Sequence, residues 1–169
     1  LHMEYLRQSH MCIRYRFTLK VNDVKYVHGD QEAVHFGLHY TADGSDEVND
    51  MLLRTTPMVD ERPERNPGLR TKFLNDDVPT DRVARLSVTL GLPDGAGYVK
   101  LASADPTVQP EFNYRYLQHP NDKRRVRDGI RKAADFLESD AYKDVCDRRL
   151  HPTDEILADD DALDIYIRQ

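Results

Sequence analysis

The sequence has 169 residues, of which 39% are hydrophobic and 32% charged, and these proportions describe one water-soluble domain with a sizeable core. Its formal net charge of −6 argues against a nucleic-acid or anionic-membrane partner. No apolar run approaches the about 18 residues of a membrane-spanning helix, and the start of the chain lacks the basic end and apolar run of a signal peptide. Cys12 and Cys146 form no disulfide framework, so we expect free thiols in a cytoplasmic protein.

Alternating apolar and polar residues predict strands in the first part of the chain. The clearest strand covers residues 11–20, whose apolar members share one face: Ile13, Tyr15, Phe17 and Leu19. Asp43-Gly44 is a tight-turn pair typical of antiparallel strands. Further strands are expected at residues 35–41, 48–59, 83–92 and 98–103, and a turn joins the last two.

The C-terminal part predicts helices. Pro120 suits a first helical turn, because its missing N–H would have no partner there. The apolar residues of a helix from about 120 to 138 recur at helical spacing: Val126, Ile130, Ala133 and Leu137. A short helix could follow over residues 140–147, Thr153 starts a third, and the acids at 159–161 begin a last one.

Residues 60–81 contain three prolines, several charges and few apolar side chains, and they predict a mobile loop. Together the elements predict a single α+β domain over residues 1–169. We expect a mixed, mostly antiparallel sheet of about five or six strands with helices on one face.

The stretch from Gly97 to Arg131 carries a ladder of residues at fixed spacing. They are Gly97, Val99, Leu101, Ser103, Asp105, Pro106, Pro110, Tyr116, Leu117, Asp122, Gly129 and Arg131. This ladder resembles the start of the C-terminal segment of glucose–methanol–choline (GMC) oxidoreductases. The block from Gly37 to Met51 is also similar to the family's substrate-domain hairpin. The sequence departs from the family at Gly95-Ala96, where Ser-Arg or Ser-Lys is usual.

The resemblance implies the substrate-binding domain of an FAD-dependent enzyme that oxidises a small-molecule alcohol to an aldehyde or ketone by hydride transfer to the flavin. The chain contains neither a G-x-G-x-x-G motif after a strand nor the family's His-x-x-Gly-Thr stretch. We therefore expect a catalytically silent fragment with no catalytic residue of its own, whose partner is the FAD-binding domain of the same enzyme. FAD would be bound by the full-length enzyme, and the apolar surface left by the missing domain predicts self-association. The alternative is a standalone α+β binding or scaffold domain without redox chemistry.

If one face of the sheet covers the flavin, the alternation of side chains along the strands makes three residues candidate substrate contacts: His39, Asn49 and Met51. The alternative is that they are ordinary sheet-face residues at a domain junction. The resemblance of residues 4–10 to a family stretch that approaches the flavin makes His10 a candidate cofactor contact, and a frayed terminus is the alternative.

No metal site is expected. His35 and His39 share a strand face, but no third ligand is placed beside them. The acidic run at 159–161 lacks the pattern of a calcium loop and suits a helix N-terminus instead. One basic set is expected to form a solvated helix face, salt-bridged to interspersed aspartates: Lys123, Arg124, Arg125, Arg127, Arg131 and Lys132.

Overall fold

The computed structural model describes residues 13–21, 37–59, 83–143 and 146–168. Seven strands and four helices follow one another in these ranges: β1 (Ile13–Val21), β2 (Gly37–Tyr40), β3 (Met51–Val59), β4 (Val83–Leu90), β5 (Tyr98–Lys100), β6 (Glu111–Asn113), α1 (Pro120–Leu137), α2 (Asp140–Lys143), β7 (Cys146–His151), α3 (Asp154–Ala158) and α4 (Asp160–Ile167). The loop predicted at 60–81 and the candidate His10 lie outside the described residues.

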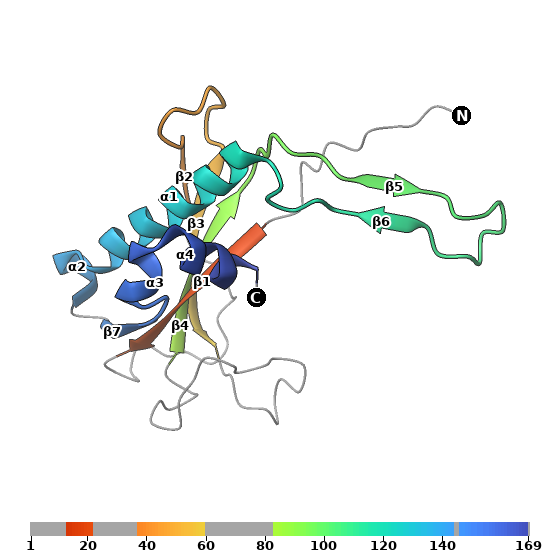
Figure 1. Ribbon diagram of the computed structural model, residues 1–169. Coiled ribbons are helices and arrows are strands. Elements are labelled where there is room, and N and C mark those ends of the chain that lie inside the picture. The colour runs from red at the N-terminus through yellow and green to blue at the C-terminus, as the bar shows by residue number, and fades with distance from the viewer. Residues whose placement is uncertain (1–12, 22–36, 60–82, 144–145, 169) are drawn as a thin grey trace.

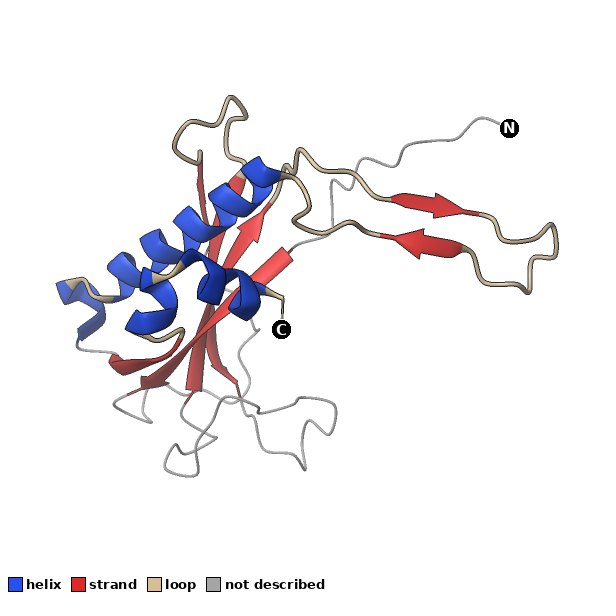
Figure 2. Ribbon diagram, in the orientation of Figure 1, coloured by secondary structure: helices blue, strands red, loops and turns tan. Residues whose placement is uncertain are grey.

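Five strands form one sheet in the order β2-β3-β4-β1-β7, and every described pairing is antiparallel. The helices gather on one face of this sheet (Figure 2). Among the described helices, none combines the length and apolarity needed to cross a bilayer. The predicted α+β class, with its antiparallel sheet and one-sided helix layer, is therefore confirmed.

The core lies between the sheet and α1. Alternate residues of β3 and β4 point towards the helix and are buried: Met51, Leu53, Leu86, Val88 and Leu90. They pack against the apolar stripe of α1, and α4 adds Leu163 and Ile167. Gly129 permits the close contact, because a Cβ there would lie 2.8 Å from Met51 Cε and 2.9 Å from Val88 Cγ1.

The strand predicted at 98–103 is shorter, and it does not join the main sheet. Among the described strands, β5 pairs only with β6, and the two form a ribbon that projects from the body as an arm (Figure 1). The reason is that the chain after β4 leaves the sheet through residues 91–97 and returns through residues 114–119 to start α1. The alternating pattern predicted the strand correctly, but the expectation that it follows residues 83–92 into the same sheet was wrong.

The second helix is also shorter than the predicted 140–147. α2 ends at Lys143, and Cys146–His151 form the edge strand β7, which pairs with β1. Three of the six residues of β7 are charged, as is common at sheet edges, so its sequence lacks a clear apolar alternation.

Candidate functional site

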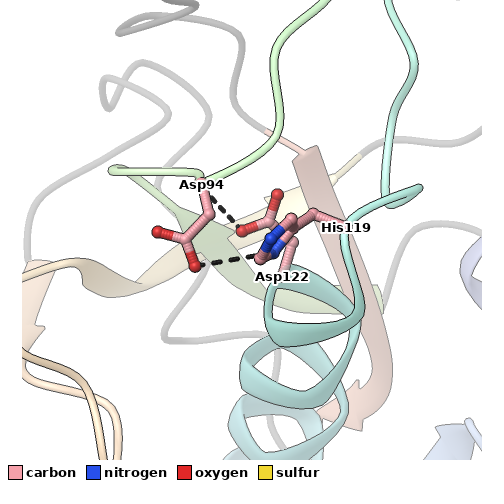
Figure 3. A group of neighbouring side chains, drawn as sticks. All are labelled: Asp94, His119 and Asp122. Atoms are coloured by element: carbon pink, nitrogen blue, oxygen red, sulfur yellow. Dashed lines mark hydrogen bonds and ion pairs between the residues drawn. The ribbon is translucent and has the colours of Figure 1, made fainter.

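The base of the arm is held against the start of α1 by the carboxylate of Asp122, which is 2% exposed. Its Oδ1 accepts the backbone N–H of Asp94 at 2.8 Å (Figure 3), and its Oδ2 accepts that of Gly95 at 2.9 Å. A Cβ at position 95 would lie 2.9 Å from this Oδ2, so glycine lets the turn approach the helix. Asp122 therefore has a positioning role for the turn after β4.

Arg125 connects this turn to the loop between β2 and β3. Its Nη1 donates to Asp50 Oδ2 at 2.8 Å and its Nη2 to Asp122 Oδ1 at 2.8 Å. Asp50 Oδ1 accepts the Ala42 amide at 2.8 Å, and the Asp50 carbonyl accepts the Gly91 amide at 2.7 Å. Three segments far apart in sequence thus meet at one buried guanidinium.

The pKa values of this pair follow from competing effects. Burial, the largest single influence, raises the pKa of Asp50, but hydrogen bonds from Ser45, the Ala42 amide and Arg125 hold it below its usual value. Burial likewise lowers the pKa of Arg125, and hydrogen bonds to Asp50 and Asp122 reverse that effect and leave it raised. Both groups are charged at neutral pH, and the ion pair is maintained.

Asp94, His119 and Asp122 offer ligand atoms within 4.8 Å of one another, which is a geometry that could hold a metal ion. However, Asp122 already accepts hydrogen bonds on both oxygens, and Asp94 Oδ2 accepts Asn121 Nδ2 at 2.6 Å. The Arg125 guanidinium lies 3.2 Å from that same Asp94 oxygen and supplies the positive charge. These three side chains therefore hold the turn after β4 against the start of α1.

The arm presents one apolar face to solvent. Val99 and Phe112 are cross-strand partners and are 41% and 51% exposed. The Phe112, Tyr114 and Tyr116 rings stack in succession, with centroids 6.0 Å and 5.2 Å apart. Since isolated two-stranded ribbons are marginally stable in water, this face has the composition of a docking surface.

The basic face of α1 is salt-bridged, as predicted, but largely to another helix. Arg127 donates to Asp164 at 2.7 Å and to Asp160 at 2.6 Å, and Arg131 donates to Asp160 at 2.6 Å. The acidic run thus forms the start of α4, where Asp159 accepts the Ala162 amide at 2.6 Å as the N-cap. Arg125 is the exception to the predicted solvated face, because it lies on the buried stripe.

The three predicted substrate-binding residues do not share a face. His39 is exposed and pairs with Leu52, on the sheet face without helices. Asn49 lies in the preceding turn with φ of 59°, and its N–H donates to Thr41 Oγ1 at 3.0 Å. Met51 is fully buried against α1. Asn49 precedes the strand and Met51 faces the helix layer, so strand parity does not place the three residues on one face; their role as substrate contacts stays a prediction.

Sequence reasoning missed Arg125 and Asp50 as a pair. The signal was present in the spacing, because Arg125 stands one residue before Val126 and four before Gly129, within the buried face of α1. A cation on an otherwise apolar helix face requires a buried partner. That partner is 75 residues away, so the helix sequence alone does not identify it.

Solved structures of two oxidases share this fold. The fold matches a formate oxidase with a TM-score of 0.67 at 17% identity, over 92% of this chain and 34% of that chain. It matches the pyridoxine 4-oxidase from Mesorbium loti with a TM-score of 0.68 at 14% identity, over 91% of this chain and 30% of that one. At these identities the likeness shows the fold.

The sequence comparisons give the family. Residues 93–169 match the family model described as GMC oxidoreductase. The oxygen-dependent choline dehydrogenase of Photobacterium profundum is 31% identical over 77 residues, covering 46% of this chain and 13% of that protein. That of Rhizobium rhizogenes is 27% identical over 125 residues, covering 70% and 22%. Residues 93–169 are therefore similar to the GMC oxidoreductase family, which confirms the resemblance, and the chain spans a small part of these relatives.

A further structural match links this fold to FAD. It is the formate oxidase of Aspergillus oryzae RIB40, whose structure was solved in a study of its FAD modification. The described part of this chain does not itself fit a dinucleotide. Its main sheet is entirely antiparallel, and no described strand leads through a glycine-rich turn into a helix that could hold a pyrophosphate. No chemical step is therefore assigned to a flavin held by these residues.

Proposed function

We propose that this chain is the substrate-binding part of an FAD-dependent GMC-type alcohol oxidoreductase, which oxidises a CH–OH donor to an aldehyde or ketone. The flavin supplies the redox chemistry when it is bound to the complementary part of the enzyme. This chain supplies substrate contacts and excludes water, and by itself it is inactive. His39 and Asn49 are proposed substrate contacts.

The observation that carries the proposal is the uncovered apolar face of the arm. The arm lies within the residues that match the family, and the aligned chain is only 34% of the formate oxidase chain. In such a protein there is ample further chain to cover Val99 and Phe112. We propose that this face docks on the FAD-binding part.

A chimera tests the proposal. The aligned segment of the Rhizobium rhizogenes choline dehydrogenase is replaced by this chain, and flavin retention is measured by absorbance after gel filtration. We expect the chimera to retain flavin and the Val99→Ser/Phe112→Ser version to lose it. The matched control is Lys100→Ser, on the opposite face of the arm, which should retain flavin.

Gene context gives an independent test that does not depend on folding of the chimera. An upstream G-x-G-x-x-G motif and a downstream His-x-x-Gly-Thr stretch in the same reading frame support the oxidoreductase. Their absence, together with a folded chimera that excludes flavin, would favour a standalone binding or scaffold domain.

A further inference from the structure

The sheet face without helices carries a cation, Arg54, beside which the described residues place no counter-ion. Arg54 alternates with the buried Leu53 and therefore stands on the face opposite α1. Its cross-strand partners are Gly37 in β2 and Ser87 in β4, neither of which brings a negative charge. Strands β2, β3 and β4 contain two arginines and a histidine and no acidic residue, in a chain whose net charge is −6.

The arginines of α1 are paired with aspartates, whereas Arg54 forms no ion pair with a described residue. The Arg54 Nε is buried and has no hydrogen-bond partner within the described chain, as is also true of the Nε of Arg125 and Arg149. One strand away, the buried Thr89 Oγ1 also lacks a partner. Thr89 stands opposite Leu52, so it is on the same face as Arg54 and diagonal to it, within reach of a long side chain.

An unpaired buried donor is costly, and a guanidinium presents its Nε–H and one Nη–H side by side, in the geometry that matches both oxygens of a carboxylate. A phosphate oxygen pair matches the same fork. A cationic ligand would instead be repelled by Arg54. The chemistry of this face therefore favours an oxyanion over a neutral or cationic group.

We propose that Arg54 binds the carboxylate of a small anionic donor, such as a hydroxy acid, on the helix-free face of the sheet. His39, exposed on the next strand of the same face, stands beside this position. The inference deepens the proposed function and rests on it for the role of the ligand as a donor. The binding itself is a property of this chain and is measured directly.

The test is an NMR titration of the ¹⁵N-labelled 169-residue chain, observing arginine Nε–Hε signals. The probe is sodium glycolate at constant ionic strength, and the Arg54 signal is identified by its absence in Arg54→Lys. We expect a saturable shift of that signal. Arg54→Lys keeps the charge but loses the fork, so glycolate affinity, followed by backbone amide shifts of β3, should fall about tenfold. Arg148→Lys, at an exposed position on the far edge strand β7, should bind as the unmodified chain does.

Two comparison ligands define the class. Choline chloride should give no saturable shift, and inorganic pyrophosphate should bind more weakly than glycolate. Equal affinity in Arg54→Lys and the unmodified chain would overturn the inference, and so would tighter binding of pyrophosphate, which would assign the face to a phosphate group. Neither result depends on flavin retention by the chimera, so failure of this inference is distinguishable from failure of the proposed function.

Discussion

Arg125 and Asp50 form an ion pair of 2.8 Å in which both side chains are fully buried. The pair joins the end of the loop between β2 and β3 to the inner face of α1, and Asp122 binds the second Nη of the same guanidinium. Removing two charges from water is expensive, so the arrangement is stable only while all partners are present. The buried ion pair, together with Asp122, fixes two loops against one helix.

Asp50→Asn should destabilise the chain strongly. The substitution leaves Arg125 buried without its carboxylate partner, and loss of one member of a buried pair costs about 3–5 kcal/mol. Urea unfolding followed by circular dichroism measures the change. Asp46→Asn, at an exposed position of the same loop, should change the free energy of unfolding by less than about 0.5 kcal/mol. Equal effects of the two variants would show that the pair is not stabilising.

The same pair predicts a pH dependence. Because the pKa of Asp50 is lowered in the folded state, its stabilisation is present above the ordinary value of 3.8 and is lost as pH falls through the folded pKa. The difference in unfolding free energy between the unmodified chain and Asp50→Asn should therefore shrink in acid. A difference that stays constant below that value would contradict a lowered pKa.

Tyr40→Phe should stabilise the chain, since the Tyr40 hydroxyl is buried without a hydrogen-bond partner in the described structure. Removing such a group is worth about 1 kcal/mol. Burial, with nearby Asp50, Asp128 and Asp43, raises the pKa of Tyr40 to about 12. A raised pKa gives stability that is complete below 10.0 and is lost as pH rises towards 12. Stability curves at neutral and alkaline pH should show a smaller alkaline loss in Tyr40→Phe.

Gly129→Ala should destabilise α1 although alanine is the better helix former by about 1 kcal/mol. The new Cβ would lie 2.9 Å from both Val88 Cγ1 and the Tyr40 hydroxyl, and overpacking costs about 1–3 kcal/mol. A double-mutant cycle with Val88→Ala checks the cause by unfolding measurements. Val88→Ala should cost less in the Gly129→Ala background, whereas strict additivity would place the strain elsewhere.

Phe112→Ser should weaken self-association of the chain without changing its fold. Phe112 is half exposed on the apolar face of the arm, so its removal leaves the core intact. Sedimentation velocity over a concentration series measures association, and urea unfolding measures stability. Lys100→Ser serves as the opposite-face control. Unchanged association in Phe112→Ser would show that the arm is not the contact surface.

Local patterns predicted the elements better than their partners. Alternation identified β1 and β4, because half-buried strands reveal their faces in the sequence. It could not show that β5 leaves the sheet, since strand pairing depends on where the connecting segments run. The Arg125 site could not be predicted for a similar reason. Arg125 lies within a basic run, which predicts a solvated side chain, and its partner Asp50 comes from a loop that is distant in the sequence.

The position of β1 in the sheet constrains how the chain folds. β1 lies between β4 and β7, so the first described strand is completed on one side only by residues 146–151. Such long-range pairing requires a long loop to close before its contacts form, and this slows folding. A nascent chain that has emerged only as far as α1 would have an unprotected β1 edge, exposed to wrong pairing until the last strand arrives.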